Sequence, residues 1–340
     1  MKVRIFCLVL LSAALSCKPS DEVRLQQFLL KGNGALKEGN TEEASRYFKE
    51  ALNVDPCYAD ALNNLGTIEF QSNRYEQALE LYNRAIVCKP DFLAAYFNRV
   101  NTYYELKQYY NAQDDINKLK ASKPDTAIIY FAEGLNLTKL RNFESAQASF
   151  SKAISLDQGN VEFLVNRGTV SYYLRQFDAA EKDLQLAESI NAKEPNIYNT
   201  RAMMAIFNNH HDEALVQIQK ALDLSPNQPY FLNNRGFVFL MQNKLPEALV
   251  DINRSIQMDP QNGWAYRNKG IYYLLTGDNA NAERLLRQAL SLDSFIERIH
   301  FYMGSAFLRN GKKKEACVEF QRSEDAGDRM VTAEMTKVCR

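Results

Sequence analysis

Residues that could perform catalysis or bind a metal are few in this chain of 340 residues. Of its three histidines, His210 and His211 are adjacent and His300 stands far from both. None has a cysteine or carboxylate partner at the spacing of a zinc site, and adjacent histidines of this kind are usually solvated. The GlyAsnGly sequence at 32–34 lacks the preceding strand and third glycine of a dinucleotide-binding loop. We therefore expect no metal, no cofactor, no small-molecule substrate and no enzymatic activity.

The first 17 residues have the composition of an export signal. Lys2 and Arg4 form a short positive region, and an apolar run follows from 5 to 11, ahead of Cys17. That run is too short to cross a bilayer as a helix, whereas secretory signals have this order of charge and hydrophobicity. The sequence therefore predicts export. The alternative is a cytoplasmic protein whose first residues only look like a signal.

The end of this segment resembles the lipobox of bacterial lipoproteins, in which the cysteine after a small residue is acylated and becomes the first mature residue. Ser16 and Cys17 occupy these places, although Leu15 stands two residues before the cysteine and not three, as in the strictest form. The resemblance implies lipidation of Cys17 and a short polar linker over 18–24. It also implies a cell-envelope protein anchored to the outer or inner membrane, facing the periplasm or the outside. An ordinary cleaved signal is the alternative.

The charges of the chain balance. Lys and Arg total 41 and Asp and Glu total 41, so the net charge is zero. Such a chain has no global field that would attract nucleic acid. We expect no nucleic-acid partner, and we expect any membrane contact to be made through the lipid anchor.

One spacing organises the rest of the chain. Nine alanines recur every 34 residues without an insertion: Ala44, Ala78, Ala112, Ala146, Ala180, Ala214, Ala248, Ala282 and Ala316. A small residue at a fixed period of this length indicates identical units stacked in register. Nine units then cover residues 25–330, and we expect the tail at 331–340 to cover the last one.

Each unit has the pattern of two helices joined by a tight turn. A large apolar residue four places after the alanine and a mostly small one seven places after it lie on one helix face. Twelve places before the alanine, seven units carry glycine, which indicates the close approach of another helix. Five places before it, residues that tolerate the left-handed conformation end the first helix. These are Gly39, Asn73, Asn209, Asn243, Gly277 and Gly311, whereas Lys107, Arg141 and Arg175 are exceptions.

This pattern resembles the tetratricopeptide repeat family. The family's unit has the same length and the same small and aromatic places, as in LeuGlyThrIleGluPhe at 65–70 followed by Ala78, Tyr82, Ala85 and Pro90. The resemblance covers 25–330. It implies an all-α fold, a right-handed superhelical solenoid of about nine helix–turn–helix repeats whose first helices line the inner wall. It also implies a protein or peptide partner bound in the concave groove.

Asparagine recurs at one place of the first helix. It is found there in five units, as Asn64, Asn98, Asn166, Asn234 and Asn268. An amide both donates and accepts hydrogen bonds, so a row of amides can hold a peptide backbone whatever its sequence. Some members of the family use an asparagine ladder in this way. The alternative is that these amides bond to their own stack.

An apolar stripe follows the same inner face. Its members are Leu135, Met203, Phe237 and Ile271, then Tyr173, Phe207, Met241 and Leu275 further along the helices, with Tyr230 and Trp264 at the entry of units seven and eight. Apolar residues facing a wide groove are unusual unless a partner covers them. We therefore predict a partner-binding groove in units four to eight. The alternative is that these residues pack between neighbouring units.

Basic residues directly follow the asparagine place, at Arg99, Arg167, Arg201, Arg235 and Lys269. They could form a cationic row for a carboxylate, as in the clamp that some family members use on a peptide's C-terminus. The lysine and asparagine places of that clamp do not recur together here. We expect each arginine to be solvated or to pack along its stem.

Four cysteines remain after the signal. Outside the cytoplasm an even number of cysteines permits disulfides. Cys57 and Cys88 fall at helix ends of adjacent units on one edge of the stack, and antiparallel packing of the tail could bring Cys339 to Cys317. We hypothesise both bridges, with buried free thiols as the alternative.

Together these features predict a membrane-tethered interaction scaffold of the bacterial cell envelope. It would be similar to repeat lipoproteins that assist outer-membrane protein assembly, pilus secretin assembly or cell-wall enzyme complexes. The alternative function is a structural adaptor subunit of an envelope assembly machine that acts through its convex face.

Overall fold

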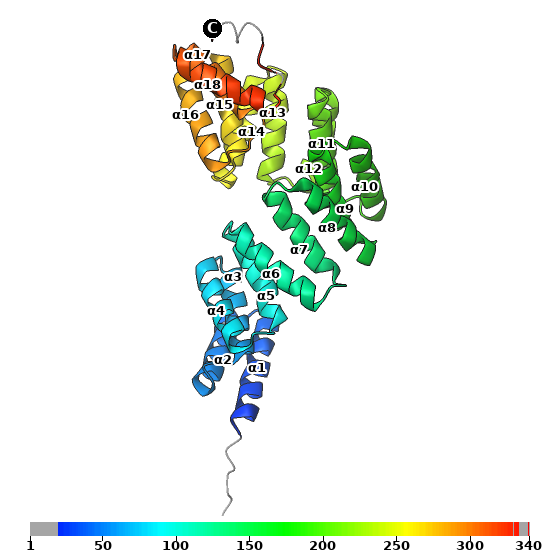
Figure 1. Ribbon diagram of the computed structural model, residues 1–340, viewed down its shortest axis with the longest axis vertical. Helices are drawn as coiled ribbons and strands as arrows, with labels where there is room; N and C mark the ends of the chain where they lie inside the picture. Colours follow the sequence, from blue (N-terminus) through cyan, green and yellow to red (C-terminus); the bar gives the residue numbers. More distant parts are fainter. Residues whose placement is uncertain (1–19, 329, 333–338, 340) are drawn as a thin grey trace, which may run out of the picture. The chain divides into compact units, whose positions relative to one another are not determined.

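The computed structural model describes residues 20–328, 330–332 and 339, which form eighteen α-helices and no strand (Figure 1). The helices are α1 (Asp21–Lys37), α2 (Thr41–Val54), α3 (Ala59–Gln71), α4 (Tyr75–Cys88), α5 (Leu93–Glu105), α6 (Tyr109–Ser122), α7 (Ala127–Lys139), α8 (Phe143–Leu156), α9 (Val161–Tyr173), α10 (Phe177–Ile190), α11 (Pro195–Phe207), α12 (His211–Leu224), α13 (Pro229–Met241), α14 (Leu245–Met258), α15 (Gly263–Thr276), α16 (Asn279–Leu292), α17 (Ile299–Arg309) and α18 (Lys313–Asp325). Consecutive helices pack as pairs, as α3 and α4 do. The chain is an all-α helical solenoid, as the 34-residue period predicts.

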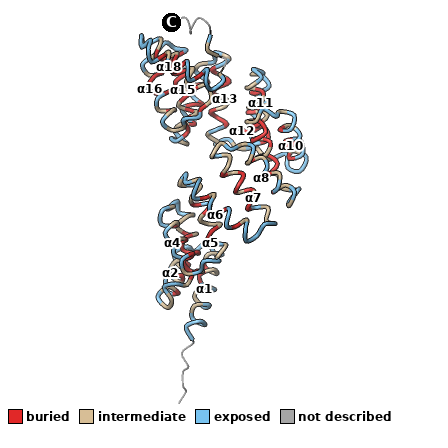
Figure 2. The backbone as a smooth tube through the Cα atoms, in the orientation of Figure 1, coloured by how far each residue is buried: buried red, intermediate tan, exposed pale blue. Residues whose placement is uncertain are grey.

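The helices belong to two compact units. The first ends at Asn142 and contains α1–α7, with core clusters around Phe48 and Ile116. The second begins at Phe143 and contains α8–α18, with core clusters around Ile218 and Ile252. Figure 2 shows the buried residues in red along the helix faces that pack together. We describe each unit separately below.

The repeated alanines lie where two helices approach most closely. All nine have 0% exposed surface, and the large apolar residues four places later are at most 3% exposed. The repeated glycines make room for these large residues. A Cβ on Gly66 would lie 2.6 Å from the Tyr82 ring, and one on Gly270 would lie 2.7 Å from Leu286. A small residue is therefore required at both places.

The turn inside each repeat has the same left-handed residue, including where the sequence does not favour it. The glycines and asparagines five places before the alanine all have positive φ, from 58° to 84°. Lys107, Arg141 and Arg175 were exceptions in the sequence, yet they adopt the same conformation, with φ of 58°, 60° and 60°. A side chain with a Cβ loses about 1–2 kcal/mol in this conformation. The packing of the two helices therefore determines the turn, and residue type has only a small influence.

The first helix of the array begins earlier than predicted. Helix α1 begins at Asp21, earlier than residue 25, and Ser20 caps it by accepting a hydrogen bond from the Val23 amide (3.4 Å). The predicted signal and Cys17 lie outside the described residues. Most of the predicted cap at 331–340 lies outside them too.

Both hypothesised cysteine pairs are disulfides in the structure. Cys57, which precedes α3, is joined to Cys88 at the end of α4, with 5.3 Å between their Cα atoms. Cys317 in α18 is joined to Cys339, with 5.4 Å between their Cα atoms. The first bridge joins the connection before α3 to the end of α4, and the second bridge joins Cys339 to the last helix.

Candidate interaction surface

The asparagine row forms hydrogen bonds within the stack. In four of the five, the amide nitrogen donates to an asparagine oxygen of the preceding repeat: Asn64 to Asn33 (3.0 Å), Asn98 to Asn63 (2.9 Å), Asn234 to Asn199 (2.9 Å) and Asn268 to Asn233 (2.8 Å). Asn166 donates to the carbonyl of Glu162 in its own helix (2.8 Å). Asn268 has 0% exposed surface, so the expectation that it contacts a partner is wrong. The contacts of the other amides favour the alternative, in which the row links neighbouring repeats.

Two of the four members of the first half of the apolar stripe are buried in the second unit. Phe237 is 8% exposed and Ile271 is 2% exposed, and both belong to the core cluster around Ile252. The expectation that these two residues face a groove is wrong, because the neighbouring repeats cover them. Leu135 and Met203 are half-buried.

The second half of the stripe reaches the surface. Tyr173, Phe207, Met241 and Leu275 occupy one place at the end of the first helix in repeats five to eight, and we call them the apolar row. Met241 is 36% exposed and Leu275 is 48% exposed, on the contacting helices α13 and α15. Tyr173 and Phe207 are half-buried. The row therefore offers accessible apolar surface on adjacent repeats.

The same place is polar in the first unit. Repeats one to four have exposed polar or charged residues there: Lys37, Gln71, Glu105 and Lys139. The repeats are equivalent in backbone, so packing inside a repeat does not require an apolar side chain at this place. The apolar row is therefore a local property of the second unit.

Trp264, also a predicted groove residue, is half-buried beside a buried arginine. The Arg267 guanidinium lies 4.7 Å from the Trp264 ring centre and 4.9 Å from that of Phe237. Arg267 is 5% exposed and donates to Asn268 Oδ1 (2.7 Å) and to the Glu297 carbonyl (3.0 Å). Burial lowers the pKa of Arg267. Its guanidinium forms no ion pair with a carboxylate in the described part of the chain.

One ion pair joins distant repeats of the second unit. Arg175, just after α9, donates to the carboxylate of Glu297, just before α17 (3.2 Å), although the two residues are 122 positions apart. Beneath this pair Tyr172 is 7% exposed. Burial, and to a smaller extent the charge of Glu297, raises the pKa of Tyr172 to about 12. The Arg175–Glu297 contact therefore joins repeats five and nine within the second unit.

The arginines that follow the asparagine place are ion-paired inside the stack. In three repeats the Nε and Nη2 atoms of the arginine donate to an aspartate sixteen residues later: Arg99 to Asp115 (2.7 and 2.7 Å), Arg167 to Asp183 (2.8 and 2.6 Å) and Arg235 to Asp251 (2.6 and 2.9 Å). The Nη1 atom donates to the second helix of the preceding repeat, at Asn83 (2.6 Å), Ser151 (3.2 Å) or Gln219 (3.0 Å). These arginines therefore link repeats and do not form a free cationic row.

Arg201 shows what happens where the aspartate is missing. Gln217 occupies that place, and Arg201 donates instead to Glu181 (3.0 Å) and Glu188 (2.6 Å) of the preceding repeat. The hydrogen bond from Arg201 lowers the pKa of Glu188. Burial lowers the pKa of Lys269, the last member of the set.

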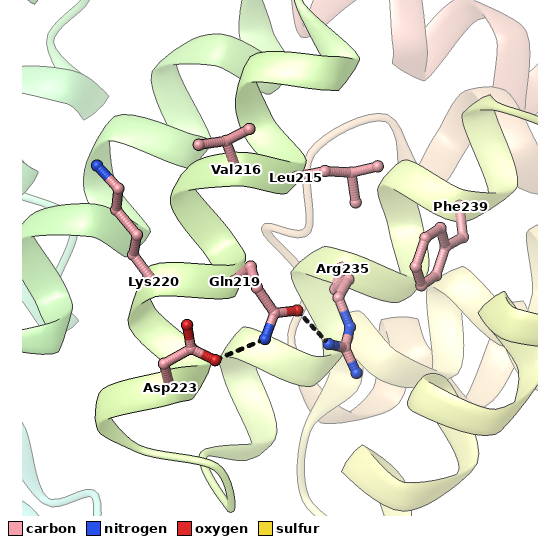
Figure 3. Close-up of a pocket in the computed structure, with 7 residues that line it drawn as sticks. All are labelled: Leu215, Val216, Gln219, Lys220, Asp223, Arg235 and Phe239. Carbon is pink, nitrogen blue, oxygen red and sulfur yellow. Dashed lines mark hydrogen bonds between the residues drawn. The ribbon is translucent and has the colours of Figure 1, made fainter.

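A surface pocket of about 430 Å³ lies between α12 and α13 (Figure 3). It is lined by Leu215, Val216, Gln219, Lys220, Asp223, Arg235 and Phe239. Gln219 donates to Asp223 (2.7 Å) and accepts from Arg235 (3.0 Å), so the polar lining groups bind one another. None of the lining residues is a histidine, cysteine or serine. The pocket thus lacks the serine or cysteine nucleophile with a histidine base that a hydrolase triad would need.

Two searches of the described residues bear on ligands and membranes. No group of three or more His, Cys, Asp or Glu side chains within the described ranges could hold a metal ion. Within the same ranges, none of the helices combines the length and the apolar character that a membrane crossing requires.

Comparisons with known proteins agree with the fold. Profiles described as tetratricopeptide repeat match residues 29–92 and 267–329 and residues 93–126 and 127–160. The chain belongs to the tetratricopeptide repeat family. Proteins of this fold are generally non-enzymatic scaffolds for protein–protein interaction. No curated protein sequence matches the chain closely enough to count as a relative.

Solved structures with the same fold are distant in sequence. One is a chain of the APC/C hetero-tetramer Cut9-Hcn1, which is 16% identical with a TM-score of 0.62, and the match covers 94% of this chain and 62% of that one. This chain therefore spans about three fifths of that structure's length. Another is pilF of Pseudomonas aeruginosa, which is 20% identical with a TM-score of 0.53 and covers 63% of this chain and 97% of that one. These likenesses concern the fold alone.

Proposed function

We propose that the protein is a scaffold of the bacterial cell envelope, tethered by a lipid at Cys17, that binds a peptide or helix of a partner protein. The docking site is the apolar row of the second unit. The observation that carries this proposal is the change from polar to apolar residues at one place of otherwise equivalent repeats. Burying the exposed part of Met241 and Leu275 would contribute about 1 kcal/mol for each side chain. The partner segment therefore carries apolar side chains spaced to contact adjacent repeats.

A second function rests on the second helices. Val216, Val250 and Val318 share one place there and are 57%, 66% and 52% exposed. A structural adaptor acting through its convex face would use such residues. The two functions therefore predict different contact surfaces for the same partner.

One pair of variants distinguishes these functions. Met241→Lys with Leu275→Lys should weaken partner capture from envelope extract by at least about tenfold, because a charge must be buried in the contact. Val216→Lys with Val250→Lys is the matched control, since it adds the same charges at exposed apolar places. We expect that control to capture the partner normally. Capture lost only in the control would establish the convex face, and capture retained by both variants would refute the apolar row.

The lipid anchor has its own test. The order of charge, apolar run and cysteine in residues 1–17 supports the tether, and disulfides are typical of proteins outside the cytoplasm. The substitution Cys17→Ala should move the protein from the membrane fraction to the soluble fraction, because no acyl chain can then be attached. The variant Cys7→Ala, within the signal, should still sediment with membranes. If the Cys17→Ala variant also sediments with membranes, the tether is elsewhere.

A further inference from the structure

The connection between α16 and α17 departs from the repeat. The corresponding connections elsewhere have four residues, such as 259–262 between α14 and α15, whereas this one has six, Asp293–Arg298. Helix α17 therefore starts later than the 34-residue period predicts, with its first turn unwound. Arg298 has φ 61° and ψ 13°, a left-handed conformation outside the repeated turn position. Residues with a Cβ hold such conformations only where surrounding contacts impose them, and these places are often functional.

The unwound residues make contacts that a regular first turn would not make. The Glu297 carbonyl accepts from Arg267, and the Glu297 carboxylate accepts from Arg175. The neighbouring Ile296 is 2% exposed and packs against Gly263. A Cβ added to Gly263 would lie 2.9 Å from the Ile296 Cδ1 atom. The segment is thus attached firmly to repeat eight through Ile296. In contrast, the Glu297 carboxylate contacts repeat five through an exposed ion pair with Arg175.

That contact is weak by its nature. The side chains of Arg175 and Glu297 are 41% and 39% exposed. An ion pair this exposed shifts a two-state equilibrium by about fivefold at most, and salt screens it. The contact also covers part of the docking site, because the Arg175 guanidinium lies 4.0 Å from the ring centre of Phe207 in the apolar row.

We propose that the segment Asp293–Arg298 is a latch that holds repeats five to nine closed, and that separation of Glu297 from Arg175 opens the inner side of the second unit. Opening frees Arg175 to leave the Phe207 ring, and it moves Tyr172 of repeat five away from Arg267, the neighbour of Trp264. The role of the latch as an autoinhibitory contact rests on the proposed docking at the apolar row. The opening itself does not depend on any partner.

Trp264 reports this opening directly, since it is the only tryptophan in the chain. Acrylamide quenching of its fluorescence, measured on the mature protein without a partner, should rise in Arg175→Glu and in Glu297→Arg, because each variant brings like charges together. The double variant restores an opposite pair and should return quenching to the wild-type level. The matched control is Arg46→Glu, which breaks the exposed pair of Arg46 and Glu43 in the first unit and should leave quenching unchanged.

A measurement on the unaltered protein guards against variants that fail to fold. Raising NaCl from about 0.05 to about 0.5 M should increase quenching of Trp264 at constant helicity, because the latch pair is screened. Quenching that stays constant with salt, or that fails to return in the double variant while its circular dichroism is native, overturns the latch. Partner capture is a separate readout. If the apolar row is the docking site, Arg175→Glu should increase partner capture. If this variant increases Trp264 quenching but does not increase capture, the docking site is refuted and the latch is not.

Discussion

At the scale of single residues, the buried arginine–aspartate pairs carry the main polar interactions between helices. Asp115 is 2% exposed and Asp251 is 5% exposed, so each carboxylate would be costly without a partner. The planar guanidinium satisfies both carboxylate oxygens and has a third N–H group left for the preceding repeat. One arginine thus fixes its own two helices and the neighbouring unit in register.

Breaking one pair should cost more than removing both partners. We predict that Arg99→Leu lowers the free energy of unfolding by up to about 3–5 kcal/mol, because the buried Asp115 then keeps only the exposed Lys118, 4.0 Å away, as an ionic partner. The double variant Arg99→Leu with Asp115→Leu should recover most of that loss, since no charge remains to be buried. Chemical denaturation with a double-mutant cycle measures both quantities.

The exposed pair of Arg46 and Glu43 provides the comparison, with side chains that are 63% and 39% exposed. Arg46→Leu should change stability by no more than about 1 kcal/mol. If the double variant at Arg99 and Asp115 is no more stable than Arg99→Leu alone, the burial of the Asp115 charge is not the cause of the destabilisation.

The sequence contained the signal for these pairs, although the prediction missed it. Aspartate stands three places after the repeated alanine only in the units of Arg99, Arg167 and Arg235. Reading each arginine separately suggested a solvated or stem-packed side chain. Comparing two places of the unit across all nine repeats would have revealed the partner, because each aspartate at the second place occurs in a unit with an arginine at the first.

At the scale of the helical element, backbone geometry follows the packing of the repeat more closely than residue preference. Lys107, Arg141 and Arg175 hold the left-handed turn that glycine or asparagine holds elsewhere. The sequence could not predict this, since turn preference is a local property and the helix pair imposes its geometry from outside the turn. In contrast, the alanine and glycine places were predictable because each marks a contact that recurs in nearly every unit.

Two glycines of α1 test this reasoning within one helix. A Cβ on Gly32 would overlap the ring of Phe48, whereas a Cβ on Gly34 would meet nothing within 4 Å. We predict that Gly32→Ala destabilises the protein by about 1–3 kcal/mol through overpacking. Gly34→Ala should instead stabilise it by up to about 1 kcal/mol, because alanine is the better helix former. Thermal melting of the two variants measures both changes, and a shift of the same sign in both would contradict the role assigned to Gly32.

At the scale of the whole molecule, the 34-residue period predicts the helix pairs but not the contacts between distant repeats. Each repeat mainly contacts its neighbours, so its own sequence specifies them. The burial of Phe237 and Ile271 depends on how closely the neighbouring repeats pack over them. The contact of Arg175 with Glu297, in repeats five and nine, depends on how the rotations between successive repeats add up within the second unit. No single unit encodes that sum. The sequence therefore placed the apolar stripe correctly along the helices but could not tell which of its members reach the surface.

The two disulfides lie near the two ends of the array, where a solenoid is weakest. Terminal repeats have a neighbour on one side only and open first. The bridges Cys57–Cys88 and Cys317–Cys339 close loops of 31 and 22 residues. Loops of this size correspond to about 3–4 kcal/mol of stabilisation for each bridge. Their position suggests that Cys317–Cys339 protects the last helix pair from local opening, that Cys57–Cys88 protects the pair α3 and α4 next to the first, and that the middle repeats are unaffected.

The positions of the bridges predict which helices exchange amide hydrogens faster when each bridge is removed. Replacing Cys317 and Cys339 together by serine should accelerate amide hydrogen exchange in α17 and α18, because these helices lose the covalent link to the end of the chain. Exchange in α11 and α12, inside the second unit, should remain within error of the wild type. The matched variant with serine at Cys57 and Cys88 should accelerate exchange in α3 and α4 and leave α17 and α18 unchanged. Acceleration spread evenly over all helices of a unit would show that the bridge stabilises the unit as a whole, and would refute its role as protection of one end.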